Sequence, residues 1–274
     1  MIRPRLPLEL VLGLSITLTM LAVALMSLVW TPHDPLAMDI TARLRPPGSS
    51  ALFGTDAYGR DVLSMVMAGA RNALAVALAA ASLGLLAGVP LGLAAAAFGG
   101  WVDDLIMRTN DLVFAFPALL IAVLISALLG PGALNAIIAI GVFNMPVFAR
   151  VTRSAALGLW SRDFISAARL AGKDRIAISR QHILPNIAGG LAIQGAIQLS
   201  LAVAADAGLS YVGLGTQPPQ PSWGRMLADA QTLIAQAPWL ALYPGAAVVI
   251  TVLGLTLTGD GLAALLDPRR NGRG

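Results

Sequence analysis

Four polar side chains lie within long stretches that are otherwise apolar: Asn144, Gln194, Gln198 and Asp206. Gln194 and Gln198 lie four residues apart and share one face of a helix, and Asp206 lies two further turns along, near the same face. A carboxylate within an apolar span is costly and usually faces a cavity or a partner. This spacing favours a polar pathway across a membrane over polar packing between helices. For Asn144, which precedes Pro146, a pathway and a simple kink are equally compatible with the sequence.

Residues for the common forms of catalysis are scarce in this chain. It has no cysteine, which excludes disulfides, thiol nucleophiles and cysteine metal sites, and its only histidines are His33 and His182. Neither a Ser/His pair nor paired carboxylates stand out in the apolar stretches, and no GxxxxGKS or GxxxxGKT phosphate loop is present. We therefore expect no catalytic residue, no metal site and no cofactor bound by the chain, which should not hydrolyse ATP itself.

The composition is that of an integral membrane protein. Of the 274 residues, 57% are hydrophobic and only 12% are charged, whereas soluble domains average about 25% charged residues. The mean hydropathy is +0.78. The sequence pI near 10.3 is better explained by membrane orientation than by a surface that binds nucleic acid.

Apolar stretches long enough to cross a bilayer, about 20 residues for a helix, recur along the chain. We predict an all-α polytopic membrane protein with a single transmembrane domain over residues 1–274. Arg3 and Arg5 precede a first apolar stretch that is longer than the core of a signal peptide, so we expect an uncleaved span there. The six expected spans cover approximately residues 9–30, 72–98, 108–129, 133–156, 187–209 and 239–260.

The basic residues are distributed unevenly between the two sides of these spans. The segments expected inside carry 13 of the 18 Lys and Arg residues, and the outer segments 31–71 and 209–238 carry the other five. Because Lys and Arg are enriched on the cytoplasmic side, both ends of the chain should lie in the cytoplasm. In the second span Gly84, Gly88 and Gly92 are spaced by four, so this span should pack against protein rather than lipid.

A short charged turn is expected between the second and third spans, at residues 103–111. Within it Arg108 and Asp111 are three residues apart and able to pair on one helical face. Pro131 and Gly132 should then form a tight outer hairpin that leads into the fourth span.

The stretch Arg162–Pro185 is a polar, basic island between two apolar spans. Ser161 is suited to cap a helix start, Asp163 lies in the first turn where the helix dipole favours an anion, and Gly172 provides a stop. The expected helix covers about residues 161–172, and a second short helix at about 174–184 should end near Pro185.

This island resembles the cytoplasmic loop motif, often called the EAA motif, of the membrane subunits of bacterial ABC importers. In that family the loop between spans 4 and 5 forms a coupling helix that docks into a cleft of an ATPase subunit. Ser166 stands where the family usually has its leading Glu, with Asp163 three positions earlier, so the acidic contact is displaced or lost. The resemblance assigns ATPase coupling to Asp163, Ser166, Ala167, Ala168, Arg169, Ala171, Gly172, Ile183, Leu184 and Pro185.

Two outer segments narrow the resemblance to one branch of these importers. Residues 53–61, FGTDAYGRD, resemble the LGTDxxGRD signature of the C-type subunit of dipeptide, oligopeptide and nickel systems. Residues 210–224, SYVGLGTQPPQPSWG, resemble the SFLGLGxxPPxPSWG stretch of the same branch, and residues 259–269 resemble its ending. Asp56, Arg60 and Asp61 are able to pair locally, and we favour a structural clasp for the first two spans over direct substrate contact.

The resemblance implies the type I ABC importer permease fold and a non-catalytic permease subunit. Its partners would be a second homologous permease in a heterodimer, two ABC ATPase subunits holding ATP and Mg²⁺, and an extracytoplasmic substrate-binding protein. The cargo would be di- or oligopeptides, with nickel or a nickel chelate as the alternative. The location would be the bacterial cytoplasmic (inner) membrane, as a multi-pass protein in the lipid bilayer. Composition alone also admits a channel or a secondary transporter, although internal repeats typical of the latter are not obvious.

Overall fold

The computed structural model describes residues 7–266, and this part of the chain is almost entirely helical. Five helices are long and apolar enough to cross a membrane, and a bent pair, α3 and α4, would make a sixth span. The helices are α1 (Leu8–Met26), η1 (Ile40–Ala42), α2 (Val62–Phe98), α3 (Gly100–Phe114), α4 (Ala118–Leu129), α5 (Ala133–Trp160), α6 (Asp163–Leu170), α7 (Arg175–Ile178), η2 (Ser179–Ile183), α8 (Leu184–Tyr211), α9 (Trp223–Ala230) and α10 (Trp239–Leu266).

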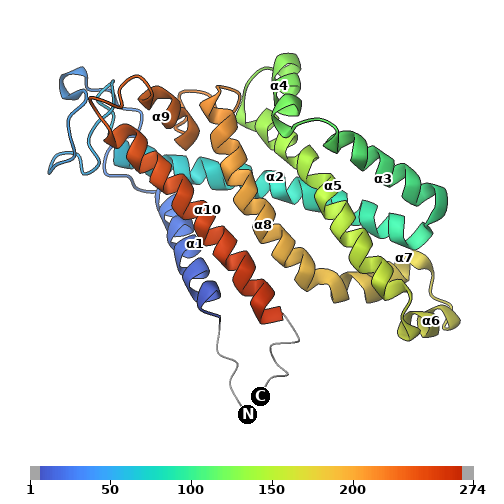
Figure 1. Cartoon of the computed structure of the whole chain (residues 1–274). Coiled ribbons are helices and arrows are strands. Elements are labelled where there is room, and N and C mark those ends of the chain that lie inside the picture. The colour runs from blue at the N-terminus through green and yellow to red at the C-terminus, as the bar shows by residue number, and fades with distance from the viewer. Residues whose placement is uncertain (1–6, 267–274) are drawn as a thin grey trace, which may run out of the picture.

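The long helices form one bundle, in which α1, α10, α8 and α5 run roughly side by side and α2 crosses behind them (Figure 1). The short helices α6 and α7 lie together at one end of this bundle, and α9 lies near the opposite end. The two ends of the described chain meet, because α1 packs along α10. Gly13 and Gly254 allow that close approach, since a Cβ at either position would collide with the facing helix.

The glycine face of α2 lies against α5, as the sequence predicted. A Cβ on Gly84, Gly88 or Gly92 would collide with the backbone or Cβ atoms of α5 between Gly141 and Arg153. Without side chains at these positions the two backbones approach closely, which is how helices gain packing contacts in lipid. This face of α2 is therefore covered by protein.

The helix α2 begins at Val62, about ten residues before its expected start. Asp61 explains the difference, because its carboxylate accepts a hydrogen bond from the backbone N–H of Ser64 (2.8 Å) and so caps the helix. The outer segment expected to extend to Arg71 therefore ends at Asp61.

The third expected span is broken. Residues 103–111 are not a turn but lie within α3, and α3 and α4 meet at an angle of 84°. The break falls at Pro117, whose ring disfavours helical geometry in the preceding residue. The predicted pair of Arg108 with Asp111 is also wrong, because Asp111 pairs with Arg150 of α5.

The expected second short helix does not end at Pro185. The chain passes from α7 through the π-helical turn η2 directly into α8, as one helical segment. Pro185 lies in the first turn of α8, directly after the π-helical turn η2. Outside the described residues lie the last three residues of the predicted C-terminal motif, from Asp267 on, and the N-terminal pair Arg3 and Arg5.

Candidate functional site

The cytoplasmic loop contains α6, whose boundaries differ slightly from the prediction. Arg162, not Ser161, is the residue at the N-cap, and it makes no capping hydrogen bond through its side chain. Ser161 ends α5 instead, where its hydroxyl donates to the carbonyl oxygen of Gly158 (3.3 Å). Asp163 does lie in the first turn of α6, where a negative charge is favourable.

Gly172 ends α6 through its backbone conformation. Its φ is +79°, in the left-handed region that a glycine adopts without strain. The N–H of Gly172 donates to the Arg169 carbonyl (2.9 Å) and the N–H of Lys173 donates to the Ala168 carbonyl (3.2 Å), the paired bonds of a Schellman motif. The loop thus turns sharply between α6 and α7.

One apolar cluster fixes α6 to the bundle. Ile165 and Ala168, on the inner face of α6, are buried together with residues of α2, α5, α7, η2 and α8. We call this group the loop cluster; it comprises Val89, Ala96, Phe148, Ala156, Ile165, Ala168, Ile178, Ile183, Ile187 and Leu191. Ala168 and Ile183, which the resemblance assigned to ATPase coupling, are therefore buried inside the protein, and their side chains hold the loop in place.

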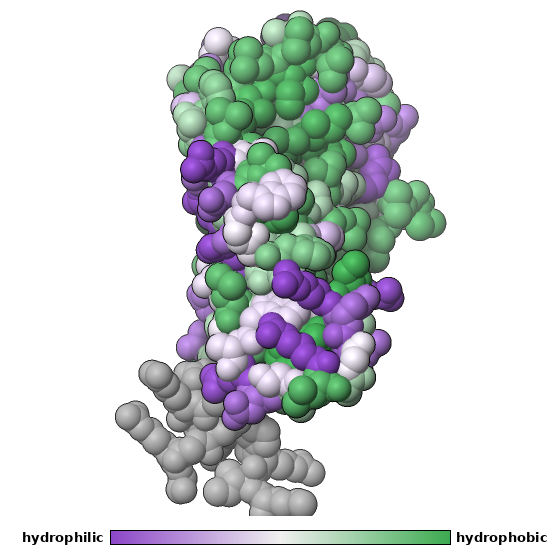
Figure 2. Space-filling view, turned by 90° about the vertical axis from the view of Figure 1, so that its right-hand side faces the viewer, coloured by the Kyte–Doolittle hydropathy of each residue, from purple (hydrophilic) through white to green (hydrophobic). Residues whose placement is uncertain are grey.

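The other predicted coupling residues are mostly on the surface. Only Leu184 is half-buried, while the exposed residues are Asp163, Ser166, Ala167, Arg169, Ala171, Gly172 and Pro185. Sequence reasoning missed Phe164 and Leu170, which are apolar yet 43% and 91% exposed. Each lies three residues from Ala167, one on either side of it, and this helical spacing was the available signal. Figure 2 shows hydrophilic side chains gathered toward the lower part of this side of the molecule, where α6 and α7 lie in Figure 1.

Arg175 connects this loop to the end of α2. Its guanidinium donates to the carbonyl oxygens of Ala97 (3.0 Å) and Phe98 (3.2 Å) and lies 5.7 Å from the centre of the Phe98 ring. A cation at a helix C-terminus also interacts favourably with the helix dipole. The carboxylate of Asp174 caps α7 by accepting from the N–H of Ala177 (2.6 Å). The loop is therefore tied to α2 by hydrogen bonds as well as by apolar contacts.

Two of the predicted pathway residues meet at one cavity. Asn144 of α5 and Gln198 of α8 both line a cavity of about 360 Å³ between α4, α5 and α8. Asn144 is 4% exposed, and its amide nitrogen has no hydrogen-bond partner among residues 7–266. The other lining residues are Ala118, Leu119, Ala122, Ala139, Ile140, Phe143, Leu201, Ala202, Ala205, Gly208 and Leu209.

Gln194 and Asp206 do not line this cavity, so the four predicted pathway residues do not all meet at it. Gln194 is half-buried, one turn before Gln198. Asp206 follows Gln198 by eight residues, which at about 100° each leaves it roughly 80° further around the helix. Asp206 is 2% exposed, and one of its carboxyl oxygens has no hydrogen-bond partner in the described part of the chain. Asp206 is therefore buried within the protein without lining the cavity.

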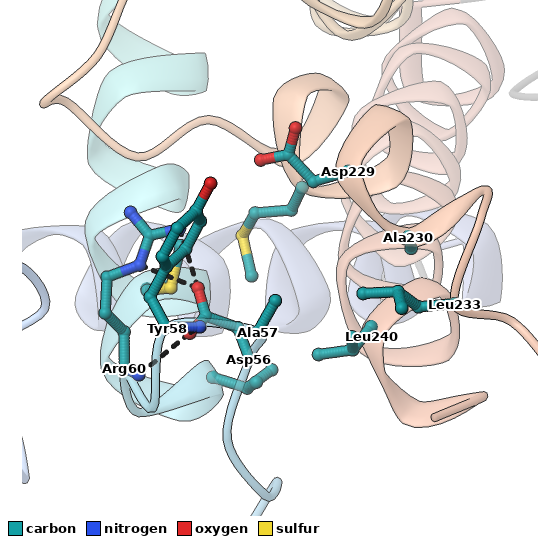
Figure 3. Close-up of a pocket in the computed structure, with 11 residues that line it drawn as sticks. Asp56, Ala57, Tyr58, Arg60, Asp229, Ala230, Leu233 and Leu240 are labelled. Atoms are coloured by element: carbon teal, nitrogen blue, oxygen red, sulfur yellow. Dashed lines mark hydrogen bonds and ion pairs between the residues drawn. The ribbon is translucent and has the colours of Figure 1, made fainter. Parts of the chain in front are cut away.

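The outer segments fold onto α2 as a clasp. Asp56 accepts from the backbone N–H groups of Tyr58 and Arg60 (both 2.8 Å) and pairs with the Arg60 guanidinium (2.6 Å), as Figure 3 shows. Asp61 does not join that pair, because it caps α2. From the second segment Trp223 is 1% exposed and donates its indole N–H to the Val66 carbonyl (3.0 Å).

A small hollow lies between this turn and α9, beside Tyr58 and Asp229 (Figure 3). Its volume of about 30 Å³ is far below that of the cavity at Asn144, and its floor is formed by apolar side chains, among them Leu233 and Leu240. A hollow of this size accommodates a water molecule but not a peptide residue.

Comparison with known proteins adds sequence and fold relationships. Residues 88–272 match the family described as binding-protein-dependent transport system inner membrane component. The chain is 38% identical to the dipeptide transport system permease protein DppC of Alkalihalophilus pseudofirmus, over 94% of this chain and 85% of that protein. It is 39% identical to the di/tripeptide transport system permease protein DppC of Pseudomonas aeruginosa, over 94% and 87%.

A further relative is the glutathione transport system permease protein GsiD of Pectobacterium atrosepticum, at 36% identity over 92% of this chain and 84% of that protein. Among solved structures, an inward facing form of the MetNI methionine ABC transporter matches with a TM-score of 0.60 and 20% identity, covering 74% of this chain and 97% of that chain. At that identity the match concerns the fold alone. The fold is that of a type I ABC importer permease, as the sequence predicted.

Proposed function

This chain belongs to the family of binding-protein-dependent transport system inner membrane components, and from that premise we propose that it is the permease subunit of an ATP-driven peptide importer. The full-length similarity to proteins named for dipeptides, di/tripeptides and glutathione supports a peptide cargo. Nickel is less well supported, because the cavity lining offers two amides but none of the carboxylates, imidazoles or thiolates that bind transition metals.

The energy for transport comes from separate ATPase subunits that hold ATP and Mg²⁺. The absence of a phosphate loop in the sequence motivates this part of the proposal. The surface offered to an ATPase is the outer face of α6, where Leu170 is 91% exposed next to the charged side chain of Arg169. A large apolar side chain on a hydrophilic surface is typical of a contact site for another protein. The chain itself supplies no catalytic group.

A second, related permease completes the translocation path. The α8 face that includes Leu201, Ala204, Ala205 and Gly208 is exposed, and a Cβ at Gly208 would meet no atom within 4 Å. Small residues on an open helix face suit close packing against another membrane helix. Asn144 and Gln198 belong to the path in this proposal, whereas Asp206 contributes to packing within the subunit.

The outer face carries the clasp and receives the substrate-binding protein. Both chain ends then lie in the cytoplasm, an orientation supported by the excess of Lys and Arg in the segments on that side. The membrane in question is the bacterial inner membrane. The location of α6 at the opposite end of the bundle from α9 is consistent with this arrangement (Figure 1).

Movement of α6 would reach the pathway through rigid contacts. The loop cluster joins α6 to α8 and α5, which carry Gln198 and Asn144, and Arg175 joins the loop to α2. ATP-driven closure of two ATPases would shift α6, and the helices attached to it would then open the path alternately to each side. Close-packed interiors transmit such shifts because they are nearly incompressible.

The observation that carries the proposal is the family match over residues 88–272 together with an exposed α6 held by the loop cluster. The test is uptake of a radiolabelled dipeptide into liposomes that contain this chain, its partner permease and both ATPases, with the binding protein outside and ATP within. We expect uptake that requires both ATP and the binding protein. Uptake by this chain alone, or uptake that is independent of ATP, would contradict the proposal.

A further inference from the structure

A basic pocket lies between the end of α2 and the start of α7. Its volume is about 500 Å³, and one wall is formed by the last turn of α2 together with Gly99. The other wall comes from the cytoplasmic loop and includes Arg169, Lys173, Asp174 and Arg175. Three of these four charges are positive, and the carboxylate of Asp174 is already used to cap α7. The pocket therefore suits an anionic ligand.

Lys173 and Arg175 are held in position at this pocket, and each keeps hydrogen-bond donors for a ligand. The Lys173 ammonium has three donors and contacts two groups, the Gln181 amide oxygen (2.7 Å) and the His182 Nε2 atom (2.9 Å). Arg175 uses its Nη1 atom for both bonds to α2, which leaves the donors on Nε and Nη2 for a ligand. Cations that are already held in place lose less conformational entropy when they bind.

Large apolar side chains lie exposed beside these cations. Phe98, which lines the pocket, is 48% exposed, and Trp101 and Leu105 of α3 are 76% and 58% exposed. Trp101 and Leu105 are four residues apart and share one face of α3, on which Arg108 follows. Figure 2 shows hydrophobic side chains over the upper part of this side of the molecule, above the hydrophilic ones. Because Trp is enriched where a membrane meets water, the start of α3 belongs at that boundary.

The ligand that fits must combine a negative headgroup with apolar chains. An anionic phospholipid offers both, because its phosphate accepts charge-assisted hydrogen bonds from Lys and Arg while its acyl chains cover apolar side chains. Inorganic phosphate would leave Trp101 and Leu105 in water. A zwitterionic phospholipid would bring its own cation close to Lys173 and Arg175. Basic pockets at the cytoplasmic side of membrane helices are typical sites for anionic headgroups.

This pocket differs from the surface proposed for the ATPase. That surface is the outer face of α6 around Leu170, which is not among the lining residues. Lys173 and Arg175 follow the sharp turn at Gly172 and lie against the end of α2 instead. From α6 the lining includes Arg169, whose guanidinium lies 5.1 Å from the centre of the Trp160 ring. The contacts to a headgroup are therefore assigned to Lys173 and Arg175.

We propose that this pocket binds the headgroup of an anionic phospholipid of the cytoplasmic leaflet. Lys173 and Arg175 contact its phosphate, and its acyl chains lie along Trp101 and Leu105. The inference rests on the membrane orientation proposed above but not on the peptide cargo. Because the walls of the pocket come from α2 and from the loop, a bound lipid joins these two elements at the place where Arg175 already connects them.

Photolabelling of the assembled importer in nanodiscs tests this site. The probe is phosphatidylglycerol with a diazirine close to its glycerol, diluted in phosphatidylcholine, and the label is located by mass spectrometry. Label on Phe98, Trp101 or Leu105 is expressed relative to label on exposed residues of α1 such as Leu18, which measures contact with bulk lipid. This ratio should fall when unlabelled phosphatidylglycerol replaces phosphatidylcholine. It should not change when inorganic phosphate is added at constant ionic strength.

Lys173 and Arg180 allow a matched pair of variants. Lys173 lines the pocket, whereas Arg180 is exposed in η2 and does not line it. Lys173→Gln should lower the labelling ratio about fivefold, the change expected when one basic side chain is lost at an anionic membrane surface. Lys173→Arg keeps the charge and should keep the ratio, which separates a lost contact from a misfolded loop. Arg180→Gln should leave the ratio unchanged.

Several results would overturn the inference. Equal falls in Lys173→Gln and Arg180→Gln would indicate a general attraction of the loop to anionic lipid, without a site. Competition by inorganic phosphate as strong as by phosphatidylglycerol would indicate a site for free anions. If a benzophenone attached to Trp101→Cys reacts with an ATPase subunit instead of lipid, the surface belongs to that partner. Labelling requires no transport, so peptide uptake by the same complex distinguishes failure of this inference from failure of the proposed function.

Discussion

The guanidinium of Arg175 donates a hydrogen bond to the carbonyl oxygen of Phe98 (3.2 Å), which ties the cytoplasmic loop to the end of α2. The helix α2 is in turn packed along α5, so a displacement of the loop reaches a helix that lines the cavity. The proposed transport mechanism depends on connections of this kind.

The first prediction concerns Arg175. Arg175→Ala removes two hydrogen bonds to helix carbonyls at the protein surface. The free energy of unfolding should therefore fall by no more than about 1 kcal/mol, with a correspondingly small fall in the melting temperature. Uptake per ATP hydrolysed should fall much further, because the loop would no longer pull on α2. The control is Arg180→Ala, an exposed arginine in η2. Unchanged coupling in Arg175→Ala would remove this residue from the mechanism.

The second prediction concerns Gly172. Gly172→Ala places a Cβ at a φ of +79°, which costs roughly 1–2 kcal/mol, although no neighbouring atom obstructs it. The end of α6 should therefore fray in this variant, with faster amide hydrogen exchange at positions 172 and 173. Gly158→Ala is the matched control, since Gly158 is also unobstructed but lies within α5. That control should be neutral or stabilising, by about 0.5–1 kcal/mol. Equal exchange rates in both variants would contradict the assignment of strain.

The third prediction compares two tryptophans of the clasp. Trp223→Phe removes a fully buried hydrogen bond to the Val66 carbonyl and should destabilise the protein by about 1–3 kcal/mol. Trp239→Phe removes a longer bond to the Thr55 carbonyl (3.3 Å) from a half-buried ring, and should cost less. Thermal unfolding of the purified complex gives both values. The reverse order would mean that the second outer segment is not the main support of the clasp.

The fourth prediction separates Gln198 from Asp206. Gln198→Leu removes an amide from the cavity and should impair uptake without affecting assembly. Asp206→Leu should leave uptake largely intact and should raise stability, because it removes a buried carboxylate that lacks one hydrogen-bond partner. Uptake and thermal unfolding are measured on the same preparations. Loss of uptake in an assembled Asp206→Leu complex would return this residue to the pathway.

Much of the architecture could be predicted from the sequence because its causes are local in the chain. The apolar stretches predicted the spans, and Gly172 predicted the end of α6. The spacing of Gly84, Gly88 and Gly92 predicted which face of α2 packs against protein, and that face meets α5. Each of these features depends on residue type and periodicity alone.

The incorrect predictions concern features that depend on contacts with neighbouring helices. The apolar run after Leu112 looks continuous, and only the structure shows that α3 is held to α5 by the pairs Asp103–Arg153 and Asp111–Arg150 while α4 bends away. The burial of Ala168 and Ile183 depends on contacts from four other helices. Asp206 lies off the cavity that Gln198 lines because a small angular offset accumulates over eight residues of a helix.

The central claim is that α6 transmits work from an ATPase, and site-specific crosslinking tests it most directly. The chain has no cysteine, so Leu170→Cys introduces a unique thiol on the exposed face of α6, which can carry a thiol-linked benzophenone. Leu52→Cys, in the outer segment and 64% exposed, is the control. In the assembled importer we predict ATPase adducts from Leu170→Cys that change in yield when ATP is added, and none from Leu52→Cys. A failure of Leu170→Cys to reach any ATPase subunit would contradict the account.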